Sequence, residues 1–211
     1  MDSSTFIYFL TASILLTLAP GPDIIYLLTK SLSDGAKCGI ILACGLVSGI
    51  VFHTILVMLG VATLIKSSTT AMLLLKIFGA TYLLFLAFGA FKSAKANKKQ
   101  LGIRNDELGI KNGSLRIYKR GILMNVLNPK VLLFFLAFLP QFVDLSSDNA
   151  SLTILFLGVT FAIQALTIFS IVAIFAGRVR NLILRKKNFG RVLNFVEALV
   201  LLIIAVGLIL F

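Results

Sequence analysis

Three long stretches of this chain carry no charged residue, namely 3–22, 38–65 and 149–177. Each meets the length of roughly 20 apolar residues that a helix needs to cross the hydrocarbon core of a membrane. Three further stretches each have one charge in their interior, and these are 71–91, 121–143 and 191–211, the last of which begins at Arg191. The sequence therefore predicts an all-α, polytopic membrane protein with six transmembrane helices.

Composition agrees with this fold class. The chain has 59% hydrophobic residues, only 13% charged residues and a mean hydropathy of +1.04. Soluble domains have about 45–50% apolar and about 25% charged residues. The six predicted spans account for most of the 211 residues, so they leave no room for a separate soluble domain.

The first apolar stretch contains a helix break where a membrane helix should be continuous. In the segment Leu18-Ala-Pro-Gly-Pro-Asp23, Pro20 and Pro22 each remove a backbone donor and disfavour the helical conformation of the preceding residue. An interior proline costs about 3 kcal/mol of helix stability. An acid, Asp23, follows the break directly. A break at this cost indicates that the interruption has a function.

A second break, Asn125-Val-Leu-Asn128-Pro129-Lys130, lies at the equivalent place in the second half of the chain, and there a positive charge follows the proline. The sequence thus predicts two three-helix halves, each opening with a broken helix, so that predicted helices 1 and 4 are the broken ones. The predicted boundaries are a first half at 1–91, a basic loop at 92–120 and a second half at 121–211, all within one domain.

Positive charges predict the orientation in the membrane. Seventeen of the twenty Lys and Arg residues fall in predicted loops on one side, whereas Lys66 is the one loop residue of this kind on the other side. The positive-inside rule then places both termini outside. Because most of the net charge of +12 lies in short loops beside helix ends, we expect it to meet anionic lipid rather than nucleic acid.

Both restarting half-helices carry residues typical of helix N-termini. Asn128 is expected as an N-cap with Pro129 at the first helical position, and Gly21 and Pro22 can be interpreted in the same way. Such helix ends attract an anion through their free N–H groups and the helix dipole. We therefore expect two anion-attracting ends that point into the helix bundle.

Asp23 and Lys130 are the charged residues at these two ends. An acid near a helix N-terminus is stabilising by itself, whereas Lys130 has the wrong sign for the dipole of its own helix. A charge in the middle of a membrane costs about 2.5–3.5 kcal/mol, so both side chains should face a partner or a wet cavity. They could form a structural ion pair.

The alternative to a structural pair is a binding site for a zwitterion such as an α-amino acid. Asp23 would hold the ammonium group, and Lys130 with the free amides would hold the carboxylate. Broken helices at equivalent places in two halves are typical of transporter binding sites. The predicted substrate-binding residues are Gly21, Asp23, Asn125, Asn128 and Lys130.

These motifs together resemble the LysE/RhtB family of amino-acid exporters over roughly residues 6–211. Besides the two breaks, the resemblance rests on Gly35, Gly39, Gly45, Gly49, Gly79, Tyr82, Leu83 and Gly89. It implies a bacterial inner-membrane protein built from two inverted three-helix repeats that dimerises. It also implies efflux of amino acids or their derivatives by proton antiport.

Four further residues are candidates for coupling or for lining the cavity. Glu197 departs from the family pattern, which has a small residue at this place, and it could either join the site or extend to the cytoplasmic surface. His53 could carry a proton or could be a hydrogen-bonded core residue. Gln164 could line the cavity or bridge two helices. Tyr82 is a further cavity candidate.

Two other functions compete with amino-acid export. A membrane redox protein with a related fold would need a cysteine beside the prolines of each break, but Cys38 and Cys44 adjoin neither break. A metal-ion exporter of the same superfamily remains the alternative, although it should cluster carboxylates or soft ligands in the spans. The sequence predicts no enzyme activity, no resident metal and no cofactor.

Overall fold

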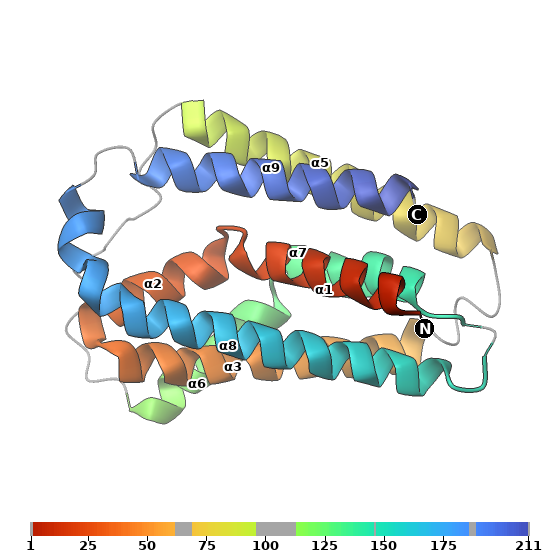
Figure 1. Cartoon of the computed structure of the whole chain (residues 1–211), viewed down its shortest axis with the longest axis horizontal. Coiled ribbons are helices and arrows are strands. Elements are labelled where there is room, and N and C mark those ends of the chain that lie inside the picture. The colour runs from red at the N-terminus through yellow and green to blue at the C-terminus, as the bar shows by residue number, and fades with distance from the viewer. Residues whose placement is uncertain (1, 62–68, 96–112, 146, 186–188, 211) are drawn as a thin grey trace.

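The computed structural model describes residues 2–61, 69–95, 113–145, 147–185 and 189–210 (Figure 1). All secondary structure in these segments is helical, as predicted. The first half contains α1 (Ser3–Leu18), α2 (Pro22–Asp34), α3 (Ala36–Leu56), the π-helical η1 (Val57–Val61) and α5 (Thr69–Lys95). The second half contains α6 (Ser114–Val126), α7 (Pro129–Leu133), the π-helical η3 (Phe134–Phe138), the 3₁₀-helical η4 (Leu139–Phe142), α8 (Ala150–Arg185) and α9 (Phe189–Leu210).

The predicted basic loop at 92–120 is shorter than expected at both ends. Helix α5 continues to Lys95, and α6 begins at Ser114. The prediction placed 114–120 in a loop because this segment is rich in basic residues, but it forms the first turns of an amphipathic helix. Residues 96–112 of the predicted loop lie outside the described segments.

Three helices are long and apolar enough to span a membrane by themselves, within Ala36–Leu59, Leu73–Lys95 and Ala150–Ala176. The two broken helices bring the candidate spans to as many as five if each bent pair is one span. Helix α1 is bent by 55° relative to α2, and α6 by 50° relative to the segment from Pro129 to Phe142. Because the apolar part of α9 is shorter, the sixth span stays a prediction.

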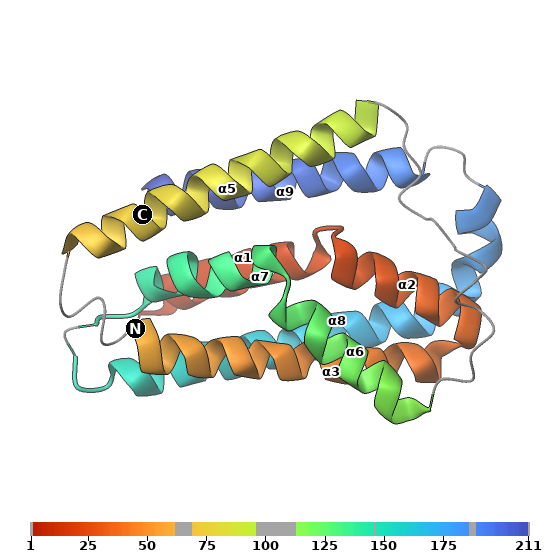
Figure 2. The ribbon, with the colours of Figure 1, turned by 180° about the vertical axis from the view of Figure 1, so that it is seen from behind.

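The helices form two parts that are visible from both sides of the molecule (Figures 1 and 2). Helices α5 and α9 pack along each other as a separate pair. In the other part, α3 packs against α6 and α8, and α2 packs against both α3 and α8. Both chain termini lie at one end of the long axis, and α2 turns into α3 at the opposite end.

Glycines allow α3 and α6 to touch through their backbones. A Cβ atom on Gly45 would lie 2.2 Å from the carbonyl oxygen of Tyr118, and one on Gly121 would lie 2.6 Å from the carbonyl oxygen of Leu42. Small residues permit this close approach between membrane helices. Gly45 and Gly49 of α3 therefore have a packing role, and they hold α6 against α3, including Asn125 near the C-terminal end of α6.

A group of phenylalanines fills the centre of the fold between α1, η3 and α8. We call it the aromatic cluster, and it consists of Phe9, Phe134, Phe135, Phe138, Phe142 and Phe161. Outside this core, large apolar side chains such as Phe85 and Phe88 are exposed. Extended apolar surface of this kind suits contact with lipid.

Candidate functional site

The first helix break has the cap that the sequence predicts. Helix α1 ends at Leu18, Gly21 is the N-cap of α2, and Pro22 is its first residue. Gly21 has no side chain with which to cap α2, so no side-chain hydrogen bond satisfies the first amides of this helix. Asp23 is buried in the first turn.

The second break also confirms its predicted cap. Asn128 is the N-cap of α7, and its Oδ1 accepts a hydrogen bond from the backbone N–H of Lys130 at 3.0 Å. Pro129 is the first helical residue, where its missing N–H needs no partner. The N-terminus of α7 is therefore capped by a side chain, whereas that of α2 is not.

A hydrogen bond joins the two breaks. The side-chain amide nitrogen of Asn125, near the end of α6, donates to Oδ2 of Asp23 at 3.1 Å. The second carboxylate oxygen, Oδ1, is buried and has no hydrogen-bond partner. Since an unpaired acceptor in a buried place is costly, this oxygen needs a donor, which either the nearby side-chain amide of Asn128 or a bound ligand can supply.

Lys130 reaches across to the first break. Its Nζ donates to the carbonyl oxygens of Leu16 at 3.1 Å and of Ala19 at 3.0 Å, which belong to the C-terminal end of α1. These carbonyls lack intrahelical partners, and the C-terminal end of a helix dipole favours a cation. The charge of Lys130 thus opposes the dipole of its own helix but matches the dipole of α1.

Glu197 of α9 also faces the first break rather than a membrane surface. A Cβ atom on Gly21 would lie 3.2 Å from Nζ of Lys130 and 3.8 Å from Oε1 of Glu197. The carboxylates of Asp23 and Glu197 both attract the ammonium group of Lys130. Two acids and one base therefore meet beside Gly21.

His53 is buried and connects to the same group of residues. Its Nε2 hydrogen-bonds to the backbone carbonyl oxygen of Asn125 at 3.1 Å, so Nε2 carries the proton. The imidazole also stacks on Phe135, with ring centroids 5.7 Å apart. Asn125 therefore contacts both residues through separate groups, His53 through its backbone carbonyl and Asp23 through its side-chain amide, and we call these three residues the polar chain.

The other two candidates lie differently. Gln164 of α8 bridges to α1, because its Nε2 donates to Oγ1 of Thr17 at 2.9 Å. Tyr82 stacks with Phe78 of its own helix at a centroid distance of 6.5 Å and contacts Phe85 at 6.1 Å with tilted rings. A role of Tyr82 in the cavity stays a prediction.

The space between the breaks is small. A cavity of about 20 Å³ is lined by Thr17, Asp23, Asn125, Lys130 and Phe161, among others. Such a volume holds about one water molecule, which is less than any amino acid occupies. The site is therefore closed in this conformation, and a bulky ligand would require the helices to move.

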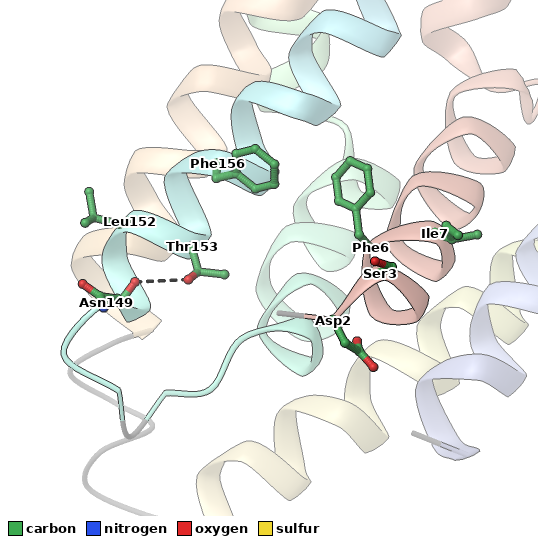
Figure 3. A pocket seen from close by; sticks show the side chains of 8 residues that line it. All are labelled: Asp2, Ser3, Phe6, Ile7, Asn149, Leu152, Thr153 and Phe156. Atoms are coloured by element: carbon green, nitrogen blue, oxygen red, sulfur yellow. Dashed lines mark hydrogen bonds between the residues drawn. The ribbon is translucent and has the colours of Figure 1, made fainter.

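The larger hollows lie away from the breaks. One is an open groove between α1 and α8, in which Phe6 and Phe156 face each other with ring centroids 5.7 Å apart (Figure 3). Another lies between α1, η4 and α9 and has a volume of about 410 Å³. Within the described segments, no three His, Cys, Asp or Glu side chains gather in a way that could hold a metal ion.

Comparison with known proteins agrees with this architecture. The LysE type translocator family matches residues 14–210. The chain is 30% identical to the leucine efflux protein of Salmonella typhimurium over 88% of this chain and 85% of that protein. It is 32% identical to the homoserine/homoserine lactone efflux protein of the same organism, over 92% and 94% of the two chains.

No solved structure matches the chain. The match to the family covers both helix breaks, the polar chain from His53 to Asp23, and Glu197. A family of translocators and relatives that are named efflux proteins identify a membrane transporter rather than an enzyme. The chain belongs to the LysE type translocator family.

Proposed function

We propose that this protein exports neutral α-amino acids and that the two helix breaks bind the substrate as a zwitterion. The observation that carries this proposal is the unpartnered Oδ1 of buried Asp23, close to the ammonium group of Lys130. The relatives are named for efflux of leucine and of homoserine, which are both neutral amino acids. An α-amino acid carries one group for each of the two charged side chains.

Asp23 accepts the substrate ammonium group through Oδ1, while Asn125 keeps the other carboxylate oxygen in place. The substrate carboxylate binds between Lys130 and the uncapped amides of α2. Gly21 gives the carboxylate room, since a side chain at this position would lie against Lys130. Asn128 holds the backbone of Lys130 through its cap.

Proton antiport is the proposed coupling. With all three groups ionised, Asp23, Glu197 and Lys130 would have a net charge of −1 in a buried site. A buried net charge is expensive, so uptake of one proton favours the closed, substrate-free site. The substrate ammonium group and the proton then compete for the same acids, and His53 connects to them through Asn125.

We also propose the wider arrangement that the family resemblance implies. Six spans form two inverted repeats of three, in the bacterial inner membrane, with both termini outside and with dimers as the assembly. The pairing of α3 with α8 and of α5 with α9 supports the repeats, because these are the second and third helices of each half. The common position of both termini at one end supports an even number of spans.

Asp23→Asn tests the substrate site. In proteoliposomes we expect this variant to lose leucine counterflow, because the amide keeps the shape of the carboxylate but not its charge. Asp34→Asn is the matched control, since Asp34 is an exposed acid at the other end of α2 and pairs with Lys30. A sharp size-exclusion profile shows that each variant is folded.

Leucine counterflow in Asp23→Asn at the wild-type rate would remove Asp23 from the site. Counterflow of cadmium but not of any neutral amino acid by the wild-type protein would favour the metal-ion exporter instead. A proton gradient that drives no leucine movement in the wild type would overturn proton antiport while leaving the substrate site intact.

A further inference from the structure

The groove between α1, η4 and α9 lies beside the α5–α9 pair. Its volume is about 410 Å³, and its lining includes Tyr8, Thr11, Leu15, Gln141, Ile204 and Gly207. It also includes Asp2, so it opens at the end of the molecule that carries both termini (Figure 1). This groove is not part of the closed cavity at the helix breaks.

One acceptor beside the groove lacks a donor, and an exposed carboxylate lies at its mouth. Nε2 of Gln141 donates to the carbonyl oxygen of Ala137 at 3.0 Å, and this leaves Oε1 buried without a partner. At the mouth, the carboxylate of Asp2 caps α1 through one oxygen, with Thr5 N at 3.0 Å. Apolar walls with a negative charge at the mouth and one amide acceptor nearby suit an ammonium group attached to an apolar body.

Aromatic rings connect this groove to the closed cavity. Phe138 lines the groove and stacks with Phe134 at a centroid distance of 4.9 Å. Phe134 in turn contacts Phe161 at 5.3 Å, and Phe161 lines the closed cavity. These three phenylalanines of the aromatic cluster therefore lie between the groove and the closed cavity.

The backbone of this barrier is also unusual. Phe134 and Phe138 are the first and last residues of η3, a π-helical segment that is followed directly by the 3₁₀-helical η4. Such segments occur frequently at functional sites and are less regular than an α-helix. A change of helical winding here would move both rings together.

We propose that the groove is the outward vestibule, which holds the exported amino acid through Gln141 after the substrate passes the aromatic cluster. This inference rests on the proposed export function and on the outward position of the termini. The substrate class is a neutral amino acid with an apolar side chain, because the walls are mainly apolar. The ammonium group binds at Gln141 after the side-chain amide turns its buried Oε1 into the groove.

Cysteine labelling tests the vestibule. In a protein with Cys38→Ala and Cys44→Ala, Ala12→Cys places a thiol in the groove, and Thr11→Cys is a second variant in case the first does not fold. A membrane-impermeant methanethiosulfonate added outside should modify either thiol and stop leucine efflux. External leucine should slow the modification.

Ser3→Cys is the matched control, because Ser3 lies at the same end of α1 but in the groove between α1 and α8 (Figure 3). Its modification should neither stop efflux nor respond to leucine. The vestibule proposal is wrong if the external reagent reaches neither the thiol at residue 12 nor the thiol at residue 11. It is also wrong if modification of these thiols leaves efflux unchanged.

Gln141→Met tests the proposed contact itself. We expect the half-saturating concentration of external leucine in exchange to rise by about fivefold, the effect of one hydrogen bond, while the value for internal leucine stays the same. Thr153→Val, in the groove of Figure 3, should change neither value. Equal changes on both sides of the membrane would show that Gln141 does not act in an outward vestibule.

These results separate the vestibule from the proposed function. Suppose that the wild-type protein exchanges leucine and Asp23→Asn does not, but the groove thiols stay unreactive. Then the vestibule proposal is wrong and the proposed function still stands. If wild-type protein moves no amino acid at all, the proposed function fails, and reaction of the groove thiols can still be measured from the mass of the labelled protein.

Discussion

The two helix breaks have the same backbone design but opposite side-chain chemistry. In each, the restarting helix has its proline at the first position and a charged residue at the second. In the second break Asn128 caps the helix with its side chain, whereas in the first break Gly21 leaves the amides of α2 free. The charged residue is the base Lys130 in one break and the acid Asp23 in the other.

Neither break is complete without the other. Lys130 of the second break caps the end of α1 in the first, and Asn125 of the second break holds Asp23 of the first. The second break therefore supports the first. The first break is left with a free acceptor on Asp23 and with the uncapped amides of α2. We therefore expect the first break to hold most of the substrate contacts, and Lys130 of the second break both to support α1 and to meet the substrate carboxylate.

Lys130→Met should have the largest effect. It removes the donor of two α1 carbonyls and leaves the buried acid Asp23 without its base, and a buried charge without its partner typically costs about 3–5 kcal/mol of stability. Thermal unfolding should show this loss, and leucine counterflow should stop. Lys30→Met is the control, because Lys30 pairs with Asp34 near the end of α2.

The double variant Asp23→Asn with Lys130→Met separates support from binding. Removal of both charges should recover much of the lost stability. If the double variant is stable but moves no leucine, the two side chains bind substrate. If it is stable and transports normally, they are a structural pair and the proposed site is wrong.

Gly121→Ala should have an intermediate effect on stability and tests how the second break supports the first. The new methyl group would lie 2.6 Å from the Leu42 carbonyl oxygen and 2.9 Å from the Leu46 nitrogen, so α6 must move away from α3. Overpacking of this kind costs about 1–3 kcal/mol. Because α6 carries Asn125, transport should also decrease.

Gly89→Ala is the matched control for Gly121→Ala. A Cβ atom on Gly89 meets no other atom within 4 Å, so the change should be neutral or slightly stabilising in a helix. Equal loss of transport in both variants, measured as leucine counterflow at matched protein levels, would contradict a special role of the contact between α3 and α6.

Substitutions at the two N-cap residues should have the smallest effects. One substitution removes a cap, and the other adds one. Asn128→Ala should cost about 1 kcal/mol of unfolding free energy, as for other lost N-caps. Gly21→Ser should change stability by only about a few tenths of a kcal/mol, because it supplies a cap to α2. It should weaken substrate binding, since its hydroxyl competes for the amides, and leucine saturation curves would measure this.

Local rules were sufficient to predict the breaks. Asn128 and Pro129 have the positions that N-cap preferences require, and so do Gly21 and Pro22. The same rules failed at the start of α6, where basic residues before residue 121 indicated a loop although the helix begins at Ser114. The number of spans could not be predicted in the same way, because the angle within each bent pair decides whether the pair crosses the membrane as one span.

Long-range contacts in the site were beyond sequence reasoning. The sign of Lys130 indicated a need for a partner, but the partner is a set of backbone carbonyls more than a hundred residues away, which no composition reveals. Glu197 was a candidate by its departure from the family pattern, and its position beside Gly21 follows only from how α9 packs. The sequence contains no signal for the vacant acceptor on Gln141.

The contact of Lys130 with the end of α1 also offers a vibrational reporter of the transport cycle. A carbonyl that accepts a hydrogen bond from an ammonium group has a weakened C=O bond and absorbs infrared light at a lower frequency. Isotopic labels at Leu16 and Ala19 would shift these two carbonyls away from the rest of the amide band. Their frequency would then rise each time the lysine leaves α1 to meet a substrate carboxylate.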